Sequence, residues 1–108
     1  MTSRATLGPK PRRDADLHFV LCDFGGLGQA YVELDPETAD RNTIIRDMLA
    51  GEYRRPVKVI ALRPDGTWRD VSLDIAWAVT KAAAVEGATL PEGARDFVAE
   101  RMGQPVSA

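Results

Sequence analysis

Apolar and polar positions from residue 17 onward follow two different periods. Residues 17–24 (LHFVLCDF) are apolar at nearly every position and end in a turn signal, which is typical of a short strand. Residues 29–34 (QAYVEL) alternate between apolar and polar, the period of a half-buried strand. The segment between them, Gly25–Gly28, contains three glycines and can adopt the positive φ angles of a tight turn. The pattern therefore predicts a β-hairpin with a glycine-rich loop.

The next stretch has the period of a helix. Asp35 and Asp40 are alternative residues for its N-cap, and Gly51 marks its end near Ala50. The apolar stripe of this helix consists of Ile44, Ile45, Met48 and Leu49.

A second hairpin is indicated further on. Residues 57–63 (VKVIALR) are rich in β-branched and apolar residues, and we expect them to form the best-buried strand, central in the sheet. The turn signal Pro64–Gly66 (PDG) follows, and residues 67–71 return as a short strand.

Two helices complete the pattern. The first is expected from Ser72, as N-cap, to about Glu86. Thr89 and Glu92 have the spacing of a capping box and predict a last helix that Gly103 closes.

The order β-β-α-β-β-α-α predicts an α+β fold. We expect a four-stranded, mainly antiparallel sheet with the helices packed mostly on one face. Residues 17–103 would form one domain, preceded by a disordered basic arm at residues 1–16 and followed by a frayed end at residues 104–108.

The composition agrees with one small globular domain. The chain has 108 residues, of which 44% are apolar and 28% charged. A single cysteine excludes an internal disulfide and any zinc site built on several cysteines. The sequence has neither an apolar run long enough to span a membrane nor a signal peptide, so a cytoplasmic protein is expected.

The net charge of −2 is unevenly distributed. Residues 1–13 carry four basic groups and no acid, whereas residues 14–108 carry ten basic and sixteen acidic groups. The basic arm could contact phosphates, but the acidic body argues against a nucleic-acid-binding domain.

No motif indicates catalysis, and we expect no catalytic residue, cofactor or metal. His18 and Cys22 share one face of a strand, but four residues of strand separate them by roughly 13 Å, too far for a nucleophile and its base. Asp70 and Asp74 flank a strand-to-helix junction, where they could bind a cation or act as acid and base. Their alternative roles are an ion pair with a nearby arginine for Asp70 and a favourable position at the helix N-terminus for Asp74.

A basic segment lies between Tyr53 and Arg69. It can bind phosphate or acidic side chains, or it can neutralise the acidic helices around it. Its candidate binding residues are Arg54, Arg55, Lys58, Arg63, Trp68 and Arg69.

Trp77 falls on the side of its helix that points away from the predicted core. Lys81 and Ala84 share this side, and an outward aromatic beside small residues suits a partner or dimer contact. The alternative is that the last helix covers Trp77.

Several segments resemble a class of small bacterial proteins of about this length. The resemblance is carried by DFGGLG at residues 23–28, LAGEY at 49–53, PVKVIA at 56–61 and WRDVS at 68–72, and it covers most of residues 18–98. It implies one compact bacterial domain. Because no activity is assigned to that class, the resemblance implies no site residues.

These observations favour a small non-catalytic domain that acts through contacts with a protein partner or as a homodimer. Two alternatives stay open. One is binding of an anionic ligand or a nucleic acid by residues 53–69, and the other is an enzyme whose Asp and Arg residues meet only on folding.

Overall fold

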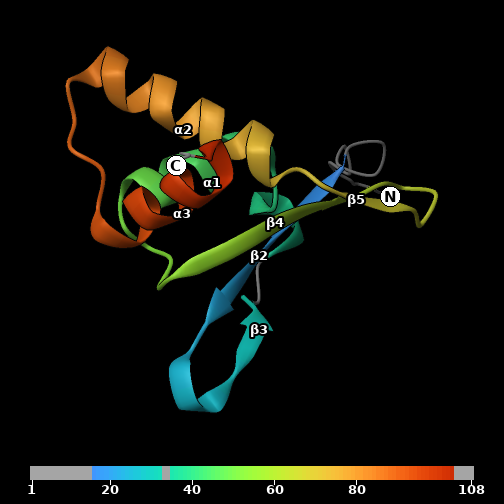
Figure 1. The fold of residues 1–108 in the computed structure, drawn as a ribbon. Helices are drawn as coiled ribbons and strands as arrows, with labels where there is room; N and C mark the ends of the chain where they lie inside the picture. Colours follow the sequence, from blue (N-terminus) through green and yellow to red (C-terminus); the bar gives the residue numbers. More distant parts are fainter. Residues whose placement is uncertain (1–15, 33–34, 104–108) are drawn as a thin grey trace.

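The chain folds as a four-stranded antiparallel sheet and three α-helices (Figure 1), which confirms the predicted α+β class. The computed structural model describes residues 16–32 and 35–103, so the expectations for residues 1–15 and 104–108 lie outside the described residues. The sheet order is β3-β2-β4-β5, with the strands β2 (Leu17–Asp23), β3 (Gln29–Tyr31), β4 (Pro56–Leu62) and β5 (Trp68–Asp70).

The helices are α1 (Arg41–Leu49), α2 (Ser72–Glu86) and α3 (Glu92–Met102). Asp40 caps α1 by accepting a hydrogen bond from the Thr43 N–H, so the later of the two expected helix starts is correct. None of the helices in the described part of the chain is long and apolar enough to cross a membrane.

The sequence predicts Ser72 as the N-cap of α2, and this prediction is wrong. The Ser72 side chain is hydrogen-bonded to β4 instead. Its buried hydroxyl accepts a hydrogen bond from the Val59 N–H of β4 at 2.9 Å. Asp70 takes over at the helix start, where its carboxylate accepts the Ser72 N–H at 2.8 Å. Asp70 therefore serves the helix rather than pairing with an arginine.

The capping box predicted at Thr89 is also wrong. The helix α3 begins at Glu92 after Pro91, and no side chain caps it. A capping box from Thr89 would need Leu90 in helical geometry, and the proline that follows Leu90 disfavours that conformation.

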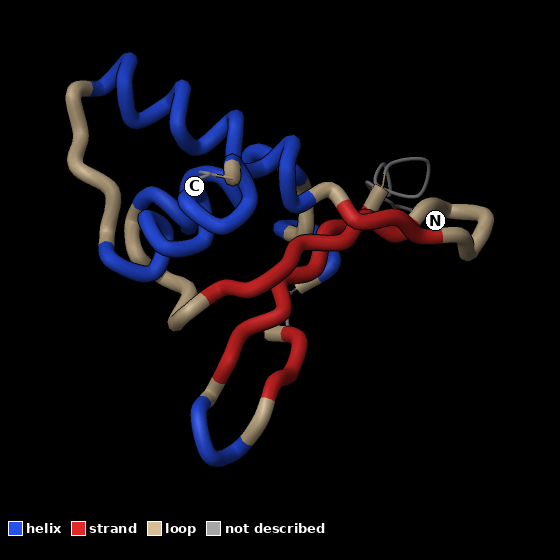
Figure 2. Tube along the Cα trace, viewed as in Figure 1, coloured by secondary structure: helices blue, strands red, loops and turns tan. Residues whose placement is uncertain are grey.

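All three helices pack on one face of the sheet (Figures 1 and 2). His18 also points to this side and is buried, and its backbone N–H donates to the Ala39 carbonyl at 2.7 Å. The core between the sheet and the helices includes Val20, Cys22, Val59 and Ala61 from the strands and Ile44, Met48, Ile75, Val79 and Phe97 from the helices.

The β2–β3 hairpin projects away from the helices (Figures 1 and 2). We call residues 24–31 the hairpin arm; every one of them is exposed. β3 was expected to be half-buried, but it pairs only with residues 21–23 at the end of β2. The helices do not extend over that end of the sheet, so neither face of β3 is covered within the described chain.

Candidate interaction surfaces

The face of the sheet opposite the helices is apolar. Along β2, and in β4 from Lys58 to Leu62, buried residues that face the helices alternate with half-buried residues on the other side. Directly opposed residues of antiparallel strands share one side, so the strand register identifies the members of this face. We call it the open sheet face; it consists of Leu17, Phe19, Leu21, Tyr31, Ile60, Leu62 and Trp68.

These seven side chains form rows across the sheet. Phe19 lies opposite Ile60 at the centre, and Trp68, which is 61% exposed, lies at one edge. Burying one large apolar side chain stabilises a protein by about 1.5–3 kcal/mol, and monomeric proteins rarely expose such groups together. A continuous apolar face of this kind is typical of a surface that contacts another molecule.

Three charged residues lie on the same side as the open sheet face. They are Asp23 at the end of β2, Lys58 opposite Leu21 and Asp70 opposite Ile60. Burial opposes ionisation of Asp70, but its hydrogen bonds from Ser72 outweigh that effect and lower its pKa. The face therefore combines both signs of charge with an apolar centre.

The basic segment is divided by β4. Arg54 and Arg55 precede this strand and Arg63 follows it, roughly 23 Å away along a seven-residue strand. Arg69 lies opposite Ala61, on the helix side of the sheet, whereas Lys58 and Trp68 lie on the open sheet face. The structure thus brings Lys58 and Trp68 to one face and separates them from the arginines.

Trp77 is exposed, as its helical position predicted. Its side chain is 53% exposed, and Lys81 and Ala84 beside it are exposed as well. The last helix α3 therefore does not cover it. Leu73, one turn earlier on α2, is also exposed, so α2 presents a narrow apolar stripe to solvent.

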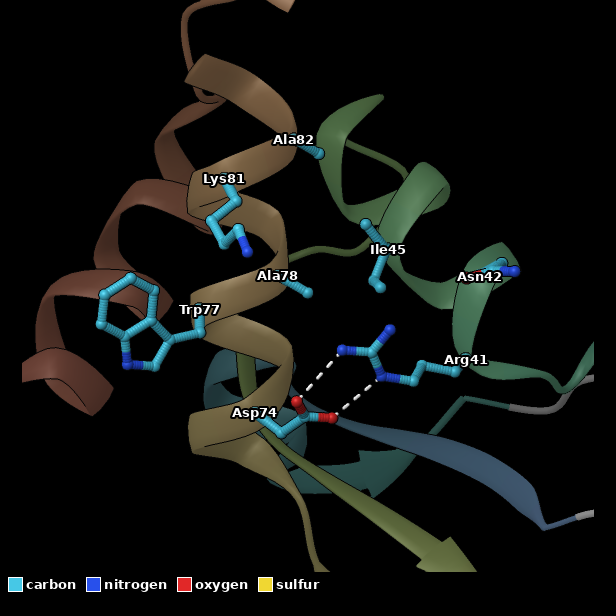
Figure 3. A pocket seen from close by; sticks show the side chains of 8 residues that line it. All are labelled: Arg41, Asn42, Ile45, Asp74, Trp77, Ala78, Lys81 and Ala82. Atoms are coloured by element: carbon cyan, nitrogen blue, oxygen red, sulfur yellow. Dashed lines mark hydrogen bonds and ion pairs between the residues drawn. The ribbon is translucent and has the colours of Figure 1, made fainter. Parts of the chain in front are cut away.

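A shallow groove of about 560 Å³ runs between α1 and α2 (Figure 3). Arg41 crosses its end and binds Asp74 through two hydrogen bonds of 2.9 and 3.0 Å. The sequence did not identify Arg41 because the two residues are 33 positions apart. Trp77 projects from α2 away from α1 and forms the rim. The groove is lined by Arg41, Asn42, Ile45, Asp74, Trp77, Ala78, Lys81 and Ala82.

Two charged groups of this groove, Arg41 and Asp74, neutralise each other. The hydrogen bonds from Arg41 lower the pKa of Asp74, and the same contacts raise the pKa of Arg41. Asp74 and Asp70 therefore have separate partners and do not form a carboxylate pair. In the described parts of the chain, no group of three or more His, Cys, Asp or Glu residues could hold a metal ion.

The single histidine and the single cysteine are both poorly suited to catalysis. Burial lowers the pKa of His18 and raises the pKa of the Cys22 thiol, so both groups are uncharged at neutral pH. Cys22 is fully buried, and a buried thiol is inert.

Two uncovered apolar surfaces therefore remain in the described structure, the broad open sheet face and the narrow stripe on α2. Comparison with known proteins identifies no relative of this chain: no protein-family model, no curated protein and no solved structure matches it.

Proposed function

We propose that this protein is a non-catalytic protein-interaction domain that binds its partner with the open sheet face. The observation that carries the proposal is the register of the four strands, which gathers seven large apolar side chains on the side of the sheet that no described helix covers. Apolar surface excluded from water supplies most of the free energy of protein association, and aromatic residues contribute strongly to it.

The chemistry of this face favours a protein over a nucleic acid. Sheets that bind single-stranded nucleic acids offer aromatic rings for base stacking beside basic groups that contact phosphates. Here four of the seven side chains are aliphatic, and Lys58 is accompanied by Asp23 and Asp70. Aliphatic groups pack well against protein side chains, while two carboxylates oppose a phosphate backbone.

The stripe on α2 is a weaker candidate for the main surface. Trp77 is its one large aromatic side chain, and the charged Lys81 lies one turn further along. The open sheet face has three aromatic residues, one on each of β2, β3 and β5. The interface proposed at Trp77, Lys81 and Ala84 therefore stays a separate prediction.

Site-specific photo-cross-linking in the native cells tests the proposal. Benzoylphenylalanine in place of Trp68 should give protein adducts, because this exposed position borders the open sheet face. The same probe in place of Val85 is the matched control, since Val85 is 86% exposed but lies on α2. The change Tyr31→Glu should reduce the adducts at position 68.

The identity of the adducts decides between the candidate functions. Protein adducts that form at position 68 and not at position 85 support the proposal. Adducts that nuclease removes would instead favour nucleic-acid binding. Equal yields at both positions, or no adduct at position 68, would show that the open sheet face is not the binding surface.

A further inference from the structure

The tip of the hairpin arm is a fixed structure that presents a leucine to solvent. The Phe24 N–H donates to the Gly28 carbonyl at 2.8 Å, and the Gly28 N–H donates to the Gly25 carbonyl at 2.9 Å. The Asp23 carboxylate accepts the Gly25 N–H at 2.8 Å. Within this bonded turn, Leu27 is 92% exposed. Backbone geometry therefore holds an apolar side chain outward rather than leaving it unplaced.

The arm has little support from the described part of its own chain. An isolated two-stranded hairpin is at best marginally stable in water, and the arm is exposed on both faces. It carries Phe24, Leu27 and Tyr31, all of them exposed. Its strand β3 is hydrogen-bonded to the end of β2 and continues away from the helices, so the arm cannot fold back onto its own open sheet face (Figure 1).

We infer that two copies of this chain form a two-fold symmetric dimer in which the open sheet faces meet and each hairpin arm lies against the other copy. The inference rests on the proposed function of the open sheet face and names its partner. Among residues 16–32 and 35–103, no apolar surface covers the arm and no helix or strand covers the open sheet face. A second copy supplies both covers through one contact.

The area of the sheet explains why the arms take part. β2 and β4 have seven residues each and β3 and β5 have three each, which at about 16 Å² per strand residue gives about 320 Å² of sheet plane. A stable interface needs about 500 Å² or more from each partner. That threshold counts accessible surface, which exceeds the area of the plane, but a plane of this size still makes a small contact. The arm, exposed on both sides, supplies the remainder.

Symmetry and charge are compatible with self-association. A two-fold contact uses the same patch on both copies and closes after two subunits. Lys58 lies on the same face as Asp23 and Asp70, so the face carries both signs and can pair with its own copy. A face of one charge sign would repel its copy.

Sedimentation of matched variants tests the dimer. The wild type should be dimeric at micromolar concentration, and Leu27→Asp should raise the dimer dissociation constant at least tenfold, because it places a charge in an apolar contact. Val85→Asp, at an equally exposed apolar position on α2, should leave the constant unchanged. Circular dichroism should show the same fold for all three proteins, since no described core residue contacts Leu27.

Benzoylphenylalanine at position 27 locates the arm in the dimer. It should cross-link to β2 or β4 of a second copy, identified by mixing isotopically light and heavy chains. A monomeric wild type, a dimer that Leu27→Asp leaves intact, or cross-links to α2 would overturn the dimer. If the wild type is monomeric while position 68 still captures a different protein, the dimer is wrong and the proposed function stands.

Discussion

Replacing Phe97 with alanine should lower the free energy of unfolding by about 3–5 kcal/mol. Phe97 is the largest of the fully buried side chains and packs from α3 into the core beneath β4. The change removes apolar contacts and leaves a cavity that the neighbouring strands and helices fill only in part. Small domains have a total stability of about 5–15 kcal/mol, so this variant should approach the limit of folding.

Urea denaturation of Phe97→Ala beside Val98→Ala measures this effect. Val98 follows on the same helix but is only half-buried, so its truncation should cost clearly less than that of Phe97. If both variants lowered the free energy of unfolding by the same small amount, the packing of α3 on the sheet would be contradicted. That packing matters for the proposed function because it directs the helices to one face, so no described helix covers the opposite face.

The change Ser72→Ala should lower the free energy of unfolding by about 1–3 kcal/mol. The strand β5 ends at Asp70 and therefore offers no carbonyl to accept the Val59 N–H of β4. The Ser72 hydroxyl accepts this N–H instead, at 2.9 Å. Alanine would leave the buried Val59 N–H without an acceptor. The free energy lost by an unpaired buried donor exceeds the stabilisation that an ordinary exposed hydrogen bond provides.

Thr80→Ala is the matched control for Ser72→Ala. The Thr80 hydroxyl is also hydrogen-bonded to the backbone, but it donates, to the Ala76 carbonyl one turn earlier in α2. That carbonyl belongs to a helix, and alanine has a higher helix propensity than threonine, so this change should be close to neutral. If Ser72→Ala lowered the free energy of unfolding no more than Thr80→Ala, Ser72 would not hold α2 to the sheet.

Much of the fold could be predicted from local patterns. The alternation and turn signals identified both hairpins, and the apolar stripe at residues 44–49 identified α1. Gly87 and Gly103, both with left-handed backbone, end the last two helices where the sequence indicated. These features depend on a few neighbouring residues, which is why one sequence is sufficient to find them.

The helix starts were less predictable because several side chains compete for the same backbone groups. Ser72 suits an N-cap, but in the folded chain its hydroxyl is drawn to β4 and Asp70 accepts its N–H. The sequence also could not identify the ion-pair partner of Asp74, because Arg41 lies on another helix. Long-range contacts of this kind arise only when the helices pack.

The open sheet face was missed although its signal was present. Residues 17–22 and 57–62 are apolar on both alternating sides, and for residues 57–63 this pattern predicts a central strand that is buried on both faces. Three helices that pack on one side of a sheet cannot cover the other side. The apolar residues at the remaining positions were therefore the evidence for an uncovered surface. The basic residues between Tyr53 and Arg69 do not form one compact patch, because the strand β4 separates Arg54 and Arg55 from Arg63.

Fluorine NMR of the two tryptophans tests the central claim most directly. The chain has only Trp68 and Trp77, one on the open sheet face and one on α2, so 5-fluorotryptophan reports on both candidate surfaces in one unmutated protein. Trp77→Phe assigns the two resonances. On dilution through the micromolar range, the Trp68 resonance should shift as the sheet face becomes solvated and the Trp77 resonance should stay in place. A shift of Trp77 alone, or of neither resonance, would contradict a dimer built on the open sheet face.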